Sequence, residues 1–402
     1  MEPKRVGLYL HIPFCRSKCA YCDFYSLANS EDKMQDYQKA LMAHIRETAP
    51  QAQGYQVDTI YIGGGTPSFY GAKRLCELLK LVHKCFKVTK DAEITVECNP
   101  DSVDAKMFRA LRRAGVNRIS LGMQSACDEE LRELNRPHTF QQVKDAVAAA
   151  RKAKLKNVSI DLIFGLPGQN KEGWTHNLEE ALALEPEHLS CYGLTLEEGT
   201  PLACRVEQGL EVPDGDEQAD LYLWTVERLE QAGYHQYEIS NFAKDGHESR
   251  HNVRYWMGWE YMGFGPAAHS DFGGCRYALV RDLDSYIEGV TKGGKLLAES
   301  ENIPQRERSG EYIMLRLRTT SGIEEWEYRR TYYMNFDPLE AKLREYEQRG
   351  WAERIENRWR LTPEGFLLSN RLIGELLELQ ENATLANTLE KIDHMPRGSA
   401  GV

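Results

Sequence analysis

The sequence has 402 residues, and its 50 Lys and Arg against 61 Asp and Glu give a formal net charge of -11. Single domains commonly run ~100 to 250 residues, so this chain is long enough for a large core plus a second unit. The acidic balance argues against a nucleic-acid backbone or an anionic membrane surface as the main partner, although it does not exclude a local basic pocket.

Cysteine usage and the N-terminus indicate the compartment. Ten cysteines without disulfide-like pairing suit a reducing environment. The start of the chain, MEPKRVGLYLHIPF, lacks the apolar core and small-residue cleavage site of a signal peptide, and no apolar run approaches ~20 residues. We therefore expect a cytoplasmic protein whose first strand begins almost at Met1, with little room for an N-terminal extension.

The first predicted strand, residues 6–12, leads into a loop with three cysteines. Its apolar and β-branched content is typical of a buried strand. The loop carries Cys15, Cys19 and Cys22 in the spacing C-x3-C-x2-C, which does not match the four-ligand patterns of structural zinc. Three protein thiolates leave one metal coordination position open. The alternatives are a zinc site completed by His11, or three buried thiols without a metal.

Strand and helix patterns then alternate as far as residue 194. On the first helix, Met34, Tyr37, Leu41 and Ile45 share one face. Six strands separated by helices predict parallel pairing through right-handed crossovers, and hence an open, partial (β/α)6 barrel like an incomplete TIM barrel. The predicted strands are 6–12, 57–62, 93–98, 118–122, 158–164 and 188–194, and the predicted helices are 33–48, 72–86, 104–114, 140–153 and 172–184.

Beyond residue 195 this rhythm ends. We predict a helix over 216–232, a Gly- and aromatic-rich segment over 250–272, and a helix over 311–318. Asp337 reads as the N-cap of a helix that Gly350 stops, and a hairpin over 351–361 precedes a helix starting at Thr362. This order resembles a winged-helix fold of α+β type, without a basic groove-reading face. The predicted domains are 1–200, 201–305 and 306–380, followed by a disordered tail over 381–402.

Polar residues follow the predicted strands at the ends where α/β folds keep their chemistry. Three glycines and Thr66 follow the second strand, and a glycine lets a backbone approach a ligand closely. Glu97 ends the third strand, Gln124 follows the fourth, and Asp161 lies inside the fifth. A carboxylate in an apolar strand is costly unless it is paired or hydrogen-bonded. An ordinary glycine turn and structural hydrogen bonds are the alternative readings.

The cysteine loop resembles the signature of the radical S-adenosylmethionine (SAM) superfamily. The resemblance implies a [4Fe-4S] cluster held by Cys15, Cys19 and Cys22. It also implies that the open iron binds the amino and carboxylate groups of SAM, which an electron from the cluster cleaves to a 5'-deoxyadenosyl radical. It assigns SAM contacts to nine further residues: Tyr9, Tyr21, Gly64, Gly65, Thr66, Glu97, Gln124, Arg136 and Asp161.

Within the superfamily, the motifs resemble the coproporphyrinogen III oxidase branch over nearly the whole chain. The matching segments are HIPFCRSKCAYCDF, GGGTP, VECNP, SLGMQS and SIDLIFGLPGQ. That branch contains oxygen-independent oxidases and their relatives, the HemW-type heme chaperones. The oxidases carry a further cysteine two positions after the third ligand, where this chain has Phe24. They also carry a longer N-terminal segment, which this sequence lacks.

A second motif favours the chaperones. His251-Asn252-Val253-Arg254-Tyr255-Trp256 matches the H-N-x-x-Y-W motif that distinguishes them. Imidazole is a usual axial ligand of heme iron, and adjacent aromatic rings can stack on a porphyrin. If the segment is helical, His251 and Tyr255 share one face. A packed surface turn with a solvated histidine is the alternative reading, and His269 is a second candidate for the heme ligand.

The resemblance implies a heme chaperone that delivers heme to acceptor hemoproteins, with respiratory and membrane-bound enzymes among the candidates, and it suggests a homodimer. The enzymatic alternative is an oxygen-independent coproporphyrinogen III oxidase that uses the 5'-deoxyadenosyl radical. A third reading is a regulatory sensor with a winged-helix-like C-terminus, which the acidic balance disfavours. The sequence leaves open whether SAM is cleaved, and so whether the protein is an enzyme.

Overall fold

A computed structural model describes residues 3–381, which form two compact units. Within the described residues, the first unit comprises residues 3–222, Ala243–His251 and Glu260–Glu301, and the second comprises Leu223–Phe242, Asn252–Trp259 and residues 302–381. The domain boundaries predicted at residues 200, 305 and 380 stay predictions. Of the predicted disordered tail over 381–402, only Glu381 lies within the described residues, where it ends a helix.

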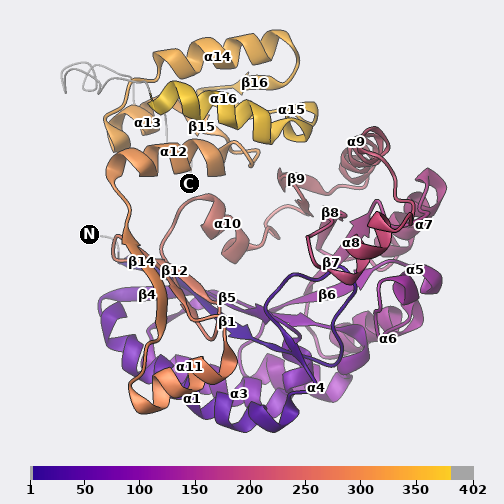
Figure 1. Ribbon diagram of the computed structural model, residues 1–402, viewed down its shortest axis with the longest axis vertical. Helices are drawn as coiled ribbons and strands as arrows, with labels where there is room; N and C mark the ends of the chain where they lie inside the picture. Colours follow the sequence, from indigo (N-terminus) through magenta and orange to yellow (C-terminus); the bar gives the residue numbers. More distant parts are fainter. Residues whose placement is uncertain (1–2, 382–402) are drawn as a thin grey trace. The chain divides into compact units, whose positions relative to one another are not determined.

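The first unit is built on the predicted parallel sheet (Figure 1). Each strand pairs in parallel with the next, which confirms the six-strand prediction. Their order is β1 (Lys4–Ile12), β4 (Tyr55–Gly64), β5 (Val88–Cys98), β6 (Arg118–Gln124), β7 (Asn157–Phe164) and β8 (His188–Gly193).

Four strands that the sequence did not predict continue this sheet beyond β1. β11 (Tyr261–Phe264) pairs in parallel with β1 and antiparallel with β12 (His269–Phe272), and β12 pairs antiparallel with β13 (Cys275–Leu279). β14 (Leu297–Asn302) follows β13 in the order of the sheet. The strand order starts at β14 and does not close on itself, so the described strands form an open, partial barrel.

The five predicted crossover helices are all present, with bounds within two residues of the prediction. They are α1 (Met34–Thr48), α3 (Ala72–Cys85), α4 (Ala105–Arg113), α6 (Phe140–Lys152) and α7 (Lys171–Leu182). Figure 1 shows α1, α3 and α4 along one side of the sheet. On α1 the predicted face is buried, and a capping box between Thr139 and Gln142 starts α6. The helices α2 (Pro67–Tyr70), α5 (Asp128–Glu133), α8 (Pro201–Glu207) and α11 (Leu283–Lys292) were not predicted.

Side chains of the parallel strands alternate between two kinds of surroundings. On β1, Leu8, Leu10 and Ile12 are fully buried among apolar residues, whereas Tyr9 and His11 face the other way. The same alternation of apolar and polar residues runs along β5, β6 and β7. The apolar set packs under the helices. The polar set therefore gathers on the opposite, inner face of the sheet.

The second unit has the predicted α+β composition. From residue 302 onward its helices are α12 (Gln305–Arg316), α13 (Glu325–Tyr332), α14 (Asp337–Gln348), α15 (Pro363–Leu367) and α16 (Ser369–Glu381). They accompany a three-stranded sheet in the order β15 (Ile323–Glu324), β17 (Arg358–Leu361), β16 (Ala352–Ile355). The predicted hairpin is confirmed as β16 and β17, which pair antiparallel, and Thr362 caps α15 as predicted.

Two boundaries differ from the prediction in this unit. Asp337 is the first residue of α14 rather than its N-cap, a position that Phe336 takes without a side-chain hydrogen bond. The Asp337 carboxylate pairs instead with Arg329, so an ion pair replaces the expected cap. The helix expected over 311–318 starts earlier, at Gln305, because Pro304 takes the N-cap position with extended backbone angles.

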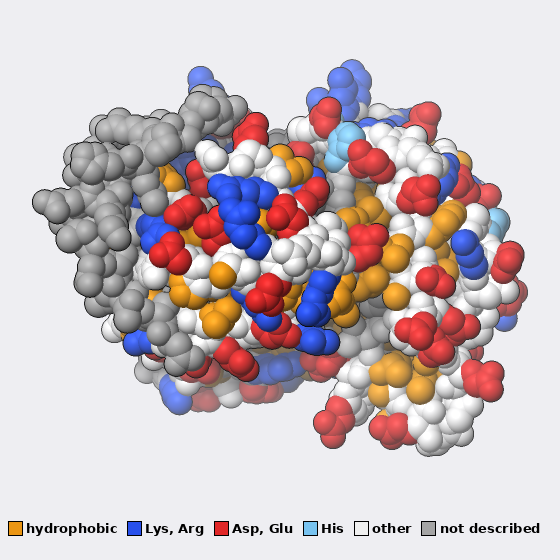
Figure 2. All heavy atoms as spheres, turned by 90° about the horizontal axis from the view of Figure 1, so that it is seen from above, with side chains coloured by type: hydrophobic (Ala, Val, Ile, Leu, Met, Phe, Trp, Pro, Cys, Tyr) orange, Lys and Arg blue, Asp and Glu red, His pale blue; other side chains and the backbone are white. Residues whose placement is uncertain are grey.

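The surface carries mixed charge. Figure 2 shows acidic and basic side chains interspersed on one face, with hydrophobic side chains between them. Many charged side chains among the described residues form ion pairs, such as Arg344 with Glu340 and Lys292 with Glu288. Among the helices within residues 3–381, none combines the length and the apolar content needed to cross a membrane.

Candidate functional site

The cysteine loop of the first unit is held at both ends. Cys15 ends the short strand β2 (Phe14–Cys15), which pairs in parallel with β3 (Leu27–Ala28) and so brings the two ends of the loop together. The His11 ring contacts the main chain near the far end, with 2.9 Å from Nε2 to the carbonyl oxygen of Tyr25. Inside the loop, the Cys22 amide donates to the Cys19 carbonyl over 3.2 Å.

Side chains donate hydrogen bonds to the sulfurs of Cys15 and Cys19. Thr66 Oγ1 donates to Cys15 Sγ over 3.4 Å, and Arg136 Nη1 donates to Cys19 Sγ over 3.2 Å. Burial raises the pKa of the Cys15 and Cys22 thiols, because the thiolate is less well solvated there. The hydroxyl and the guanidinium act in the opposite direction and favour a thiolate. The positive charge of Arg136 thus lies beside the cysteine loop, where it would offset the negative charge of metal-bound thiolates.

The thiols fit an iron-sulfur cluster better than a single metal ion. Among residues 3–381, no three His, Cys, Asp or Glu side chains are grouped so as to hold one metal ion. Cluster thiolates each bind a different iron, so they need not converge on one point. Both ring nitrogens of His11 are engaged, Nδ1 with the Tyr9 hydroxyl and Nε2 with Tyr25, and burial lowers the His11 pKa to about 4. These bonds disfavour the alternative in which His11 completes a zinc site.

The glycine segment after β4 packs closely against the start of the cysteine loop. A Cβ atom on Gly65 would lie 3.0 Å from Cys15 Sγ and 2.8 Å from the Phe14 carbonyl oxygen. Gly64 has a φ of +113°, and a Cβ there would lie 2.6 Å from the His11 ring. The chain's own packing therefore already requires glycine at both positions. That Gly64, Gly65 and Thr66 also contact SAM stays a prediction.

Glu97 is the central carboxylate of the inner face. Its two oxygens accept from the Tyr61 hydroxyl over 2.7 Å and from the Gly64 amide over 3.1 Å. Burial raises its pKa to about 7, while the hydrogen bond from Tyr61 acts in the opposite direction. Asp161, on β7, accepts from the hydroxyl of Ser120 over 3.0 and 3.1 Å, and burial raises its pKa as well.

Arg136 and Gln124 meet at the end of β6. The second terminal nitrogen of Arg136, Nη2, donates to Asn99 Oδ1 over 2.5 Å and to the Gly122 carbonyl over 2.9 Å. A Cβ on Gly122 would lie 2.9 Å from both the Arg136 and the Gln124 side chains. Gln124 has a φ of +66°, a rare conformation for a residue with a side chain. Such backbone strain is typical of binding and catalytic sites.

The two predicted tyrosines have different surroundings. Tyr9 lies on the inner face, where its ring stacks on Tyr61 at 6.3 Å. Tyr21 packs against a buried apolar cluster that includes Leu134 and Leu166, and burial raises its pKa beyond its usual range. The packing of Tyr21 is thus accounted for without a ligand, and its contact with SAM stays a prediction.

Most of the predicted SAM residues are partly exposed, although the strand residues beside them are mostly buried. They come from β1, β4, β5, β6 and β7, from the cysteine loop, and from the segment after α5. The residues are Tyr9, Tyr21, Gly64, Gly65, Glu97, Gln124, Arg136 and Asp161.

The H-N-x-x-Y-W segment forms the short helix α10 (Arg250–Trp256), so the condition for His251 and Tyr255 to share a helix is met. The amides of Arg250 and His251 both donate to the Glu93 carboxylate over 3.0 Å. His251 is 1% exposed, with Nδ1 2.8 Å from Thr59 Oγ1 and its ring stacked on Tyr61 at 5.3 Å. His251 is therefore a packed side chain here, not a solvated one. His269, at the start of β12, is exposed.

Several residues of this site were not predicted, Tyr61, Thr59 and Glu93 among them. Their signal in the sequence is the polar side chain at every second position of an otherwise apolar strand. Tyr61 follows Ile60, and Ser120 lies between Ile119 and Leu121. A period of two with polar residues on one side marks an inner face that is not packed as core.

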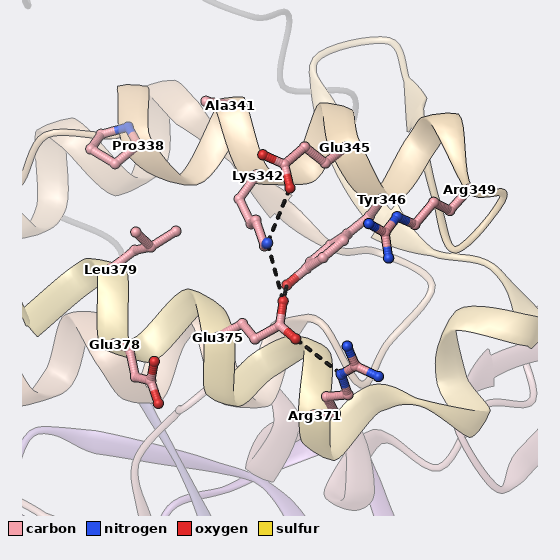
Figure 3. Close-up of a pocket in the computed structure, with 10 residues that line it drawn as sticks. All are labelled: Pro338, Ala341, Lys342, Glu345, Tyr346, Arg349, Arg371, Glu375, Glu378 and Leu379. Atoms are coloured by element: carbon pink, nitrogen blue, oxygen red, sulfur yellow. Dashed lines mark hydrogen bonds and ion pairs between the residues drawn. The ribbon is translucent and has the colours of Figure 1, made fainter.

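The second unit carries a groove of about 700 Å³ between α14 and α16 (Figure 3). At its centre Glu375 accepts from Arg371, Tyr346 and Lys342, and these contacts, led by Arg371, lower its pKa to about 2. Because these charges satisfy one another, the groove does not by itself identify a ligand.

Comparison with known proteins finds a family match in each unit. Residues 9–181 match the radical SAM superfamily, and residues 303–368 match the HemN C-terminal domain. The chain is 35% identical over 372 residues to the heme chaperone HemW of Bacillus subtilis (strain 168), covering 92% of this chain and 98% of that protein. It is 35% identical over 369 residues to the heme chaperone HemW of Escherichia coli (strain K12), covering 92% and 97%.

One solved structure is similar over most of the chain. Coproporphyrinogen III oxidase (HemN) from Escherichia coli, described as a radical SAM enzyme, matches with a TM-score of 0.82 and 25% sequence identity. The match covers 94% of this chain and 90% of that chain. The predicted fold is therefore confirmed over nearly its full length.

Proposed function

Because the chain belongs to the heme chaperone HemW family within the radical SAM superfamily, we propose that it binds a [4Fe-4S] cluster, SAM and heme, and that it transfers heme to acceptor hemoproteins. The names of the relatives support the chaperone reading. Binding of each cofactor and the transfer step are the parts that need testing.

Cys15, Cys19 and Cys22 would hold the cluster, and the partly exposed residues of the inner face would hold SAM. A cluster with one open iron, when bound, supplies an electron to SAM. One observation carries the assignment: Arg136 donates to Cys19 Sγ and to the end of β6 at Gly122. A single side chain thus joins the proposed cluster loop to the proposed SAM site. Its charge also suits a carboxylate such as that of SAM.

The heme proposal depends on α10 and its histidine. Axial ligation needs an imidazole nitrogen within reach of the iron. His251 is buried, so ligation by this residue requires its ring to leave the contacts with Thr59 and Tyr61. His269 needs no such change, because its side chain is exposed. We keep His251 as the proposed ligand on the strength of the motif, with His269 as the alternative.

Two further parts of the proposal come from the resemblance. The acceptors would be respiratory hemoproteins, including membrane-bound ones, and the protein would act as a homodimer. A cytoplasmic location is proposed from the sequence. Two units with mixed surface charge are compatible with protein partners, and the acidic balance of the chain disfavours a nucleic acid.

The deciding experiment is a heme titration of anaerobically reconstituted protein, followed in the Soret region. We expect saturable binding that weakens in His251→Ala, and binding close to native in a control, His176→Ala, which removes an exposed histidine on α7. If only His269→Ala weakens binding, His269 is the ligand. If the native protein binds no heme, the chaperone proposal is wrong.

The similarity to coproporphyrinogen III oxidase supports a second candidate function, decarboxylation of the porphyrinogen propionates. Phe24 argues against it, since the oxidases have a cysteine at this position, and its side chain here is 71% exposed. An anaerobic assay with reductant, SAM and coproporphyrinogen separates the two. Formation of protoporphyrinogen would establish the oxidase activity.

A further inference from the structure

Tyr61 contacts both proposed ligand sites. Its hydroxyl donates to Glu97, a proposed SAM contact, over 2.7 Å. Its ring stacks on His251, the proposed heme ligand, with 5.3 Å between centroids and an angle of 22° between the planes. All three residues belong to the first unit. One side chain therefore connects the two sites directly.

A second aromatic ring also holds Tyr61 in place. Tyr9, its neighbour in the register of β1 and β4, stacks at 6.3 Å with an angle of 29°. The Tyr9 hydroxyl is in turn hydrogen-bonded to His11 Nδ1 over 2.9 Å. A ring held in this way cannot shift toward His251 or Glu97 without changing its other contacts.

Hydrogen bonds hold His251 in its position. Glu93 accepts from its amide and Thr59 Oγ1 lies 2.8 Å from its Nδ1. At 1% exposure the imidazole has no open path to a planar ligand of the size of a porphyrin. Ligation of heme by His251 would therefore need a second, released arrangement in which a ring nitrogen is available.

We propose that Tyr61 is a positioning residue that couples the two sites, so that SAM bound at Glu97 holds His251 in its packed position and opposes heme binding. The inference rests on the proposed function, because it requires that the chain bind both SAM and heme. The contacts decide whether the two ligands favour or oppose each other. A ligand that favours the observed Tyr61–Glu97 arrangement also stabilises the stack of Tyr61 on His251. Heme ligation by His251 breaks this stack, so the two ligands oppose each other. Such coupling is reciprocal, so heme must weaken SAM binding by the same factor.

The test measures each ligand's affinity with and without the other. Heme is titrated in the Soret region, and SAM by calorimetry on the cluster-loaded protein. We expect SAM to weaken heme binding to the native protein by ~5-fold or more, with the same factor for SAM when heme is present. In Tyr61→Phe the ring stack remains but the hydrogen bond to Glu97 is lost. We expect the factor, which is the ratio of the heme affinities without and with SAM, to fall below ~2-fold.

Two further variants keep the test decisive. Tyr55→Phe removes another tyrosine-glutamate hydrogen bond on β4, to Glu260, and should behave as native. Thr59→Val removes a hydrogen bond that holds His251 packed, and should tighten heme binding by ~5-fold in the absence of SAM.

Three results would overturn the proposal. The first is independent binding of SAM and heme to the native protein, which leaves the chaperone function standing. The second is a native coupling factor in Tyr61→Phe, which would place the coupling elsewhere. The third is a native protein that binds no heme, which removes the proposed function as well and is distinguishable from the first two.

Discussion

Arg136 donates to Cys19 Sγ over 3.2 Å with one terminal nitrogen and to the Gly122 carbonyl over 2.9 Å with the other. The contact joins a loop near residue 19 to the end of a strand about a hundred residues later in the sequence. The remaining nitrogen of Arg136, Nε, is buried and has no hydrogen-bond acceptor among residues 3–381. A buried donor without an acceptor is costly, so a bound carboxylate would relieve this cost.

We predict that Arg136→Gln lowers SAM affinity by ~10-fold or more, because a charge-assisted hydrogen bond contributes about 1.5 to 3 kcal/mol and ~1.4 kcal/mol is tenfold in affinity. Calorimetry on the cluster-loaded protein measures the change. Arg132→Gln is the control, since Arg132 is exposed and pairs with Glu129 across the surface of α5. Equal SAM affinity in native protein and Arg136→Gln would exclude this residue from the SAM site.

Gly64 allows a test of local packing. Gly64→Ala adds a Cβ at a φ of +113° and 2.6 Å from the His11 ring. Gly54→Ala, at a φ of +93° with nothing within 4 Å, adds backbone strain alone. We expect Gly54→Ala to cost about 1 kcal/mol or more, and Gly64→Ala to cost a further ~1 to 3 kcal/mol from overpacking. Thermal unfolding of both variants, followed by circular dichroism, compares them. Similar melting temperatures would mean that the His11 ring moves aside at little cost.

The three cysteines together should be needed for the cluster and not for the fold. We predict that replacing Cys15, Cys19 and Cys22 by Ser removes iron and the brown cluster absorption, while the far-ultraviolet circular dichroism stays native. Cys204→Ser, on the exposed surface of α8, should keep a full complement of iron. Iron retained in the triple variant would disprove the ligand assignment.

Glu97 should make stability depend on pH. Its pKa in the folded protein is about 7, above the ~4.3 of an unperturbed glutamate. Between these values the folded state binds a proton that the unfolded state has lost. The stabilisation is therefore full below about pH 4.3 and disappears as the pH rises through about 7. The charged groups that face Glu97 are Asp161, which raises this pKa, and Arg118, which lowers it; the hydrogen bonds from the Tyr61 hydroxyl and the Gly64 amide lower it too.

Urea unfolding from about pH 5 to about pH 8 tests this dependence in the protein without its cluster. We expect the midpoint of the native protein to fall more steeply with pH than that of Glu97→Gln. Glu238 in the second unit also has a pKa raised to about 7 by burial, so the difference between the two proteins isolates Glu97. Glu77→Gln, an exposed position on α3, should follow the native curve. Parallel curves for native and Glu97→Gln would show that Glu97 is ionised throughout.

The fold of the first unit could be predicted where local signals were strong. Six strands with sustained apolar content, separated by five helices, favour parallel pairing through right-handed crossovers. β11 was missed because Tyr261–Phe264 is only four residues long and shows no alternation. Its place beside β1 is decided by tertiary pairing, which a short segment does not reveal.

The site could be predicted only in part for a similar reason. The cysteine spacing and the residues at strand ends are visible in the sequence, and the resemblance gave them roles. Contacts across strands depend on register: Tyr61 meets His251, 190 residues later, only because β4 and the start of α10 come together. Packing also gives Gly64 a second explanation. A side chain at this position would clash with the His11 ring, so glycine is needed there whether or not a ligand binds.

The alternation along the parallel strands has a consequence for how such a protein can change. Residues such as Leu8, Ile94 and Leu121 hold the helices, while their sequence neighbours Tyr9, Glu93 and Ser120 do not contribute to that apolar packing. Substitutions at one set alter what the inner face recognises, and substitutions at the other alter whether the chain folds. Because the two sets interleave one residue at a time, new chemistry can be acquired on this sheet without rebuilding its core.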